Sequence, residues 1–211
     1  MIAAFGVLTA LMYSGPPVRI APSPPPPLIL AYAEVDVDHD GAPDSISITM
    51  VAGGEIPGGC AGPDYHLWTG RFVVTVSLAM GRSVSTYLNP LFGEEGDLTF
   101  FAPPWTLFVA DYKRDGQPGF NLAEWSCHNN TAYHLFTVRP DGRVEPLCVE
   151  GSYSVGVLGD EASTADIKLT PEGFQTDQYD NSTPAGCTFF WGWNPARKQF
   201  DLVGRKCTPI P

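Results

Sequence analysis

The stretch Asp36-Val-Asp-His-Asp-Gly-Ala-Pro-Asp44 runs directly into Ser45-Ile-Ser-Ile-Thr-Met-Val51, and this junction is the most informative part of the chain. The second segment alternates polar and apolar residues, so Ile46, Ile48 and Met50 fall on one face of an extended strand. The first segment contains Gly41 and Pro43 just before Asp44, and both Gly and Pro favour turns. The pattern predicts a tight acidic loop that opens into a β-strand.

The rest of the chain is also typical of a β-rich protein. It contains 22 Gly and 21 Pro among 211 residues, which disfavours a helical fold because both residues end helices and populate turns. Several strand-like segments form pairs around turn sequences. The pairs are 71–78 with 83–88, 133–138 with 144–147, 167–169 with 174–176, and 188–193 with 199–203. No segment keeps a helical apolar period over three turns. The sequence therefore predicts an all-β fold of antiparallel hairpins or a β-meander.

A weak internal repeat suggests duplication. Residues 36–47 align with Asp111-Tyr-Lys-Arg-Asp-Gly-Gln-Pro-Gly-Phe-Asn-Leu122, and Asp, Asp, Gly and Pro recur at loop positions one, five, six and eight. We therefore expect a pseudo-repeat of 28–104 and 105–211, as duplicated β units or propeller-like modules. The Gly-rich stretch Ala52-Gly-Gly-Glu-Ile-Pro-Gly-Gly-Cys-Ala-Gly62 predicts a long surface loop.

The start of the chain predicts export. Residues 1–14 form an apolar leader of signal-peptide length, although a basic first segment is missing, and 15–27 form a proline-rich extended linker. The leader is too short for an ordinary membrane-spanning helix. We expect a β-rich calcium-binding domain at 28–211 that is secreted, periplasmic or at the cell surface, with no stable membrane span after processing.

Five widely spaced cysteines fit an oxidising compartment, although buried thiols are the alternative. No CxxC pair occurs, so the cysteine spacing typical of zinc-ribbon and thioredoxin-like sites is absent. Cys187 and Cys207 lie near opposite ends of the last predicted hairpin, which favours a disulfide between them. Cys60, Cys127 and Cys148 have no pairing that the sequence decides.

The acidic loop has the chemistry of a calcium site. Ca²⁺ takes six to eight oxygen ligands and favours carboxylates, and Gly41 at the sixth position permits the sharp turn that lets alternate side chains converge. The predicted ligands are Asp36, Asp38, Asp40, the backbone carbonyl of Ala42, and Asp44. The bidentate Glu of a helical EF-hand is absent, because Ser47 stands at that position. The segment Ser45 to Val51 is strand-like, so we expect the loop to lead into a sheet and not a helix. The alternative is an Asp-rich turn without metal.

This loop resembles those of FG-GAP and VCBS-type repeats of exported bacterial proteins, whose DxDxDGxxD loops precede a β-strand. The resemblance implies a β-sheet repeat with a structural calcium held at positions 36, 38, 40, 42 and 44. The second copy departs from it, because Lys113 replaces the third-position Asp and Gly119 the ninth. An ammonium between Asp111 and Asp115 would neutralise that pair as a cation does, or the copy is an ordinary turn.

Charge and motifs narrow the function. A net charge of −11 with only 12 Lys and Arg disfavours nucleic acid as a partner. No HExxH or GxSxG motif occurs, Cys127 and His128 are merely adjacent, and Glu94, Glu95 and Asp97 resemble any acidic loop. Catalysis is therefore the minority interpretation. The stripe Phe189, Trp191 and Trp193 predicts core packing, with an exposed platform for sugar stacking as the alternative.

The sequence leaves three functions open. The first is an extracytoplasmic, calcium-stabilised, non-enzymatic module that binds an unknown protein or glycan. The second is a periplasmic inhibitor or immunity protein against a lysozyme-like cell-wall hydrolase, which the general layout resembles although no inhibitory motif is matched. The third is a glycan-acting enzyme. A deep cleft with two facing carboxylates would favour the enzyme, a protruding rigid loop the inhibitor, and a shallow surface the binding module.

Overall fold

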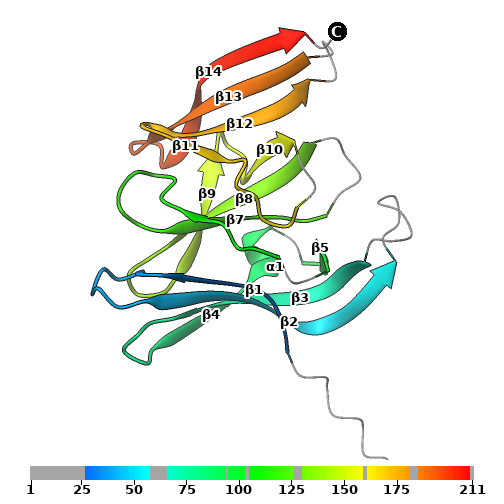
Figure 1. Cartoon of the computed structure of the whole chain (residues 1–211), viewed down its shortest axis with the longest axis vertical. Helices are drawn as coiled ribbons and strands as arrows, with labels where there is room; N and C mark the ends of the chain where they lie inside the picture. Colours follow the sequence, from blue (N-terminus) through cyan, green and yellow to red (C-terminus); the bar gives the residue numbers. More distant parts are fainter. Residues whose placement is uncertain are drawn as a thin grey trace, which may run out of the picture.

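The protein is built almost entirely from β-strands (Figure 1). The computed structural model describes residues 27–57, 66–93, 95–102, 105–125, 130–158, 161–180 and 185–209. Within these ranges the strands belong to a five-stranded and a nine-stranded sheet, and nearly all neighbouring strands are antiparallel. The prediction of an all-β fold is confirmed.

The first sheet is an antiparallel meander. Its strands are β1 (Leu28–Val35), β2 (Asp44–Pro57), β3 (His66–Ser77) and β4 (Ser83–Tyr87), in that spatial order, and β5 (Leu98–Phe101) pairs with the other end of β3. The short helix α1 (Leu88–Leu91) follows β4. The predicted alternation after the acidic loop is confirmed, because Ile46 and Ile48 are fully buried and Met50 nearly so, with exposed or half-buried residues between them.

The second sheet contains the remaining strands. They are β6 (Val109–Ala110), β7 (Gly119–Ala123), β8 (Asn130–Val138), β9 (Val144–Val149), β10 (Ser154–Leu158), β11 (Lys168–Thr170), β12 (Gly173–Asp180), β13 (Ala185–Asn194) and β14 (Gln199–Pro209). Strand β14 pairs with β9 in parallel, and β10, which pairs with β8, lies against β12. Strands β12, β13, β14, β9, β8 and β10 thus curl into a nearly closed barrel.

The predicted hairpins are confirmed, whereas the prediction of a Gly-rich surface loop at 52–62 is partly wrong. The four predicted pairs correspond to β3–β4, β8–β9, β11–β12 and β13–β14. Residues 52–57, however, continue β2, and 58–62 lie outside the described residues. Gly53 faces Gly70 on β3, and both have positive φ, 128° and 155°. A Cβ on Gly53 would lie 2.1 Å from the carbonyl oxygen of Thr69, so glycine lets two backbones approach here rather than ending the strand.

Strand β8 lies between two hydrophobic cores. Phe136 and Val138 point into the core under the first sheet, whereas Tyr133 and Leu135 point into the barrel. Because side chains alternate along a strand, a strand that is buried on both faces contributes side chains to both cores. The predicted aromatic stripe of β13 lies in the barrel core: Trp191 is buried and Phe189 and Trp193 pack against it. The core-packing interpretation is confirmed for Trp191, whereas Phe189 and Trp193 are only partly buried.

The predicted disulfide between Cys187 and Cys207 is present and links β13 to β14. Cys148 is a free, partly buried thiol, and Cys60 and Cys127 lie outside the described residues. The same holds for the predicted leader and for the linker up to residue 26. No helix among the residues that the structure describes has the length and apolar character needed to cross a membrane.

Candidate metal centre

The acidic loop closes the hairpin between β1 and β2, with Val35 paired to Asp44 at its base. Two residues have left-handed backbone, His39 at φ 62° and Gly41 at φ 86°, and these turns wrap the chain around its own side chains. The amide of Gly41 donates to Asp36 Oδ2 at 3.0 Å, and that of Asp40 donates to Asp38 Oδ1 at 3.2 Å. These local bonds between side chain and backbone fix the loop.

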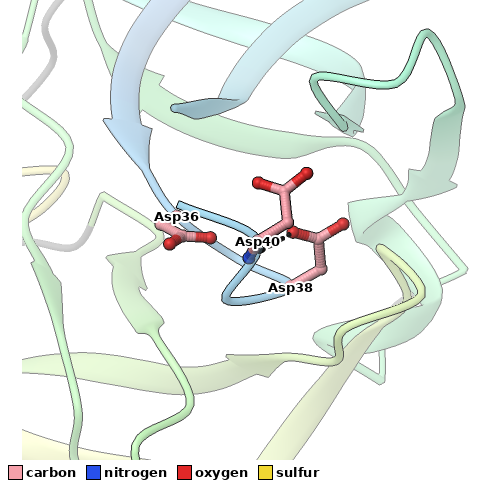
Figure 2. A group of neighbouring side chains, drawn as sticks. All are labelled: Asp36, Asp38 and Asp40. Atoms are coloured by element: carbon pink, nitrogen blue, oxygen red, sulfur yellow. Dashed lines mark hydrogen bonds between the residues drawn. The ribbon is translucent and has the colours of Figure 1, made fainter. Parts of the chain in front are cut away.

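Three of the predicted ligands come together. Asp36, Asp38 and Asp40 each present a carboxylate oxygen, and these oxygens lie within 4.8 Å of one another. Figure 2 shows the three side chains on the single loop, with the bond from Asp38 to the amide of Asp40. Calcium–oxygen distances are 2.3–2.6 Å, so two ligands of one ion are at most about 5 Å apart. The separation fits one coordination shell.

Asp36 has an oxygen without a partner. Its Oδ2 accepts the amide of Gly41, but its Oδ1 is buried and has no hydrogen-bond donor in the described part of the chain. An ionised carboxylate oxygen can only accept, and a buried acceptor without a partner is costly. A cation between the three carboxylates would satisfy it, so the loop chemistry fits a hard divalent ion.

The other two predicted ligands, Asp44 and the carbonyl of Ala42, are not part of this carboxylate cluster. Asp44 is 2% exposed, and its oxygens accept the amides of Val37 and Ala79, each at 2.7 Å. It therefore anchors the loop to the turn after β3, a role that the sequence pattern did not reveal. Ala42 donates its amide to Asp40 Oδ1 at 2.8 Å. Coordination by Asp44 and by the Ala42 carbonyl remains a prediction.

The Asp111 loop has the same conformation as the first. It closes the β6–β7 hairpin, with Ala110 paired to Gly119 as Val35 is to Asp44. Its fourth and sixth positions, Arg114 and Gly116, have φ of 60° and 87°. The sixth-position amide again donates to the first-position carboxylate, here at 2.8 Å. The weak sequence repeat therefore corresponds to a repeated loop structure.

Lys113 occupies the third position of the second loop, where the first loop has the carboxylate of Asp38. Lys113 Nζ lies 2.7 Å from Asp115 Oδ2 and 5.8 Å from the centre of the Trp193 ring. Only 16% of the Lys113 side chain is exposed.

The absence of an Asp at the ninth position of the second loop also has a structural cause. A Cβ on Gly119 would lie 2.3 Å from the carbonyl oxygen of Phe136, so β8 leaves no room for a side chain.

The two loops touch each other. His39 Nε2 lies 3.0 Å from Gln117 Nε2, which joins the fourth position of the first loop to the seventh of the second. Arg114 donates to the carbonyl of Thr170 at 2.7 Å and so ties the second loop to the end of β11. The loop pair therefore connects the first sheet to the barrel.

The catalytic candidates are not assembled in the described residues. Asp97 pairs with Arg71 at 3.1 Å, and Glu94, Cys127 and His128 lie outside those residues. Two surface hollows of about 450 and 230 Å³ each have one carboxylate in their lining, Glu172 and Glu150. Neither hollow has the pair of facing carboxylates that the glycan-enzyme hypothesis requires.

Comparison with known protein families, with curated proteins and with solved structures gave no match for this chain. The function must therefore be argued from the loop and from the surface.

Proposed function

We propose that this protein is an extracytoplasmic binding module whose fold is stabilised by a structural calcium ion in the Asp36–Asp44 loop. The convergence of three carboxylates carries the proposal, together with the buried Asp36 Oδ1 that lacks a donor. The loop joins the paired strands β1 and β2, which supports a role for the ion in holding this hairpin closed. The disulfide between Cys187 and Cys207 supports an oxidising compartment.

Electrostatics gives the ion its structural role. Two carboxylates 4 Å apart repel by about 4 kcal/mol at an effective dielectric of 20, so three of them oppose the folded loop when no cation is bound. Calcium reverses that repulsion, which couples binding to folding of the loop. The resemblance to FG-GAP and VCBS-type loops supports the same role.

Thermal unfolding tests the calcium site. The melting temperature is measured with excess Ca²⁺ and with a chelator, for the native chain and for Asp38→Ala and Asp40→Ala. A concentration of 100 times Kd stabilises by about 2.7 kcal/mol, which corresponds to a rise of about 5–10 °C for a domain of this size. Both variants lose the rise.

Asp166→Ala is the matched control, because Asp166 is an exposed carboxylate outside the loop. It retains the full response to calcium. Superimposable melting curves of the native protein with Ca²⁺ and with chelator would refute the metal site. An equal loss of response in Asp166→Ala would show that calcium acts through general surface charge.

A further inference from the structure

The outer face of the first sheet is covered by no other described element. The rest of the chain packs on one side of β1–β4, where Val74 and Val76 are fully buried (Figure 1). Strand pairing aligns the outward residues in three rows. From β1 to β4 these are Ile29, Thr49, Val73 and Tyr87; Tyr32, Ser47, Thr75 and Ser85; and Glu34, Ser45, Ser77 and Ser83. We call these twelve residues the hydroxyl face.

Four of the seven Ser and Thr hydroxyl groups on this face are paired by hydrogen bonds. Thr75 Oγ1 and Ser85 Oγ are 2.9 Å apart, and Ser83 donates to Ser77 at the same distance. A hydroxyl has one donor and two acceptor positions, so one such bond leaves each group able to bond outward. Short side chains on adjacent strands lose little rotamer freedom when they bind. The result is an ordered array of donors and acceptors.

Two tyrosines stand at opposite edges of this array. Tyr32 on β1 is 53% exposed and Tyr87 on β4 is 57% exposed. Three strand spacings separate them, about 14 Å across the sheet. The hydroxyl of Tyr32 donates to Glu34 Oε1 at 2.9 Å, which fixes the position of that ring. Exposed aromatic rings give a large contact area with few rotatable bonds.

The face is nearly uncharged on an acidic protein. Only Glu34 among the twelve residues carries a charge, whereas the whole chain has a net charge of −11. Arg71 lies on β3 outside the hydroxyl face, and its guanidinium is paired with Asp97. On this face the edge strand β4 presents Ser83, Ser85 and Tyr87, and the edge strand β1 presents Ile29, Tyr32 and Glu34. The neutral patch complements a neutral partner, and the acidic surroundings repel an anionic one.

We propose that the hydroxyl face binds a neutral polysaccharide, an inference that rests on the proposed role as a binding module and names its partner class. Sugar hydroxyls exchange hydrogen bonds with the Ser and Thr rows, and the apolar faces of pyranose rings pack on Tyr32 and Tyr87. The spacing of the rings fits an extended chain of several sugar units lying across the strands.

Affinity electrophoresis tests this binding. The calcium-loaded full chain is run through gels that contain laminarin, mannan, xyloglucan or hydroxyethylcellulose, and through a gel with anionic polygalacturonate. At least one neutral polymer retards the native protein, and polygalacturonate does not. Tyr32→Ala and Tyr87→Ala each weaken retardation by tenfold or more. Tyr153→Ala, which alters a tyrosine that is 55% exposed outside this face, is the matched control and leaves it unchanged.

A second variant changes charge instead of aromatic area. Thr75→Glu places a carboxylate at the middle of the array and abolishes retardation, while circular dichroism confirms that it folds. Free migration of the native protein in every neutral gel overturns the proposal, as does equal loss in Tyr153→Ala. Self-association through this face, seen as a dimer that Thr75→Glu dissociates, also overturns it. These results do not depend on the melting experiment, so failure of the calcium site and failure of the glycan site are distinguished.

Discussion

His134 gives a quantitative test of the packing between the two layers. Its ring stacks on Phe92 of the first core, with centroids 4.2 Å apart, and its buried Nδ1 has no hydrogen-bond partner in the described residues. Burial lowers the pKa of His134 from 6.5 to about 4, because charging an imidazole away from water is unfavourable. No carboxylate among the described residues offsets this effect of burial on the pKa.

The sign of the pH effect follows from the lowered pKa. Between pH 6.5 and 4 the unfolded chain binds a proton at this residue and the folded chain does not, so stability falls as the pH drops through that range. The same two pKa values give a loss of about 2 kcal/mol from this group between pH 7.5 and 5.0. Above about pH 7.5 the contribution is nearly constant, because His134 is then neutral in both states.

Denaturant unfolding at the two pH values measures this loss. His134→Phe keeps the aromatic stack on Phe92 but does not titrate, so its stability falls by about 2 kcal/mol less than that of the native chain between pH 7.5 and 5.0. Titration of the carboxylates is common to both proteins and cancels in the difference. His66→Gln is the control for the removal of a histidine that is not buried, because His66 is exposed and pairs with Glu55. An identical pH dependence in the native chain and His134→Phe would show that the buried-ring argument is wrong.

Two further predictions concern the loops. Asp44→Ala leaves the amides of Val37 and Ala79 without their acceptor, so the free energy of unfolding falls by about 3 kcal/mol in denaturant titration, even with excess calcium. An unchanged midpoint would contradict the anchoring role of Asp44. Lys113→Met lowers stability by about 1 kcal/mol with no rescue by calcium, whereas Lys113→Asp makes a larger part of the stability depend on calcium. A calcium response of Lys113→Asp no greater than that of the native chain contradicts the view that the ammonium replaces an ion.

The local features were predictable because their causes are local. The acidic loop needs only Gly at its sixth position and carboxylates that bond amides a few residues away, and all of these lie within nine residues. The alternation after it fixed the buried face of β2 in the same way. The hairpins follow from turn residues between strand-like segments.

The remaining features depend on contacts between distant residues. The parallel pairing of β14 with β9 and the approach of β10 to β12 leave no signal in either strand alone. The sequence predicts a loop at Gly53, because a glycine-rich run has the same composition whether it turns or lets two strands approach. The role of Asp44 was missed for a related reason, since one of the amides that it accepts belongs to Ala79, far away in the sequence.

The position of the loops explains why a single ion would matter to the whole fold. Asp44 ties the first loop to the turn after β3, and His39 contacts Gln117 of the second loop. The second loop in turn reaches β11 through Arg114 and the barrel core through Lys113 and Trp193. A cation bound at Asp36, Asp38 and Asp40 would therefore act at the contact between the two loops, whereas the second loop has Lys113 paired with Asp115. On the proposed calcium role, removal of the ion would lower the stability of the whole domain and not only of one hairpin.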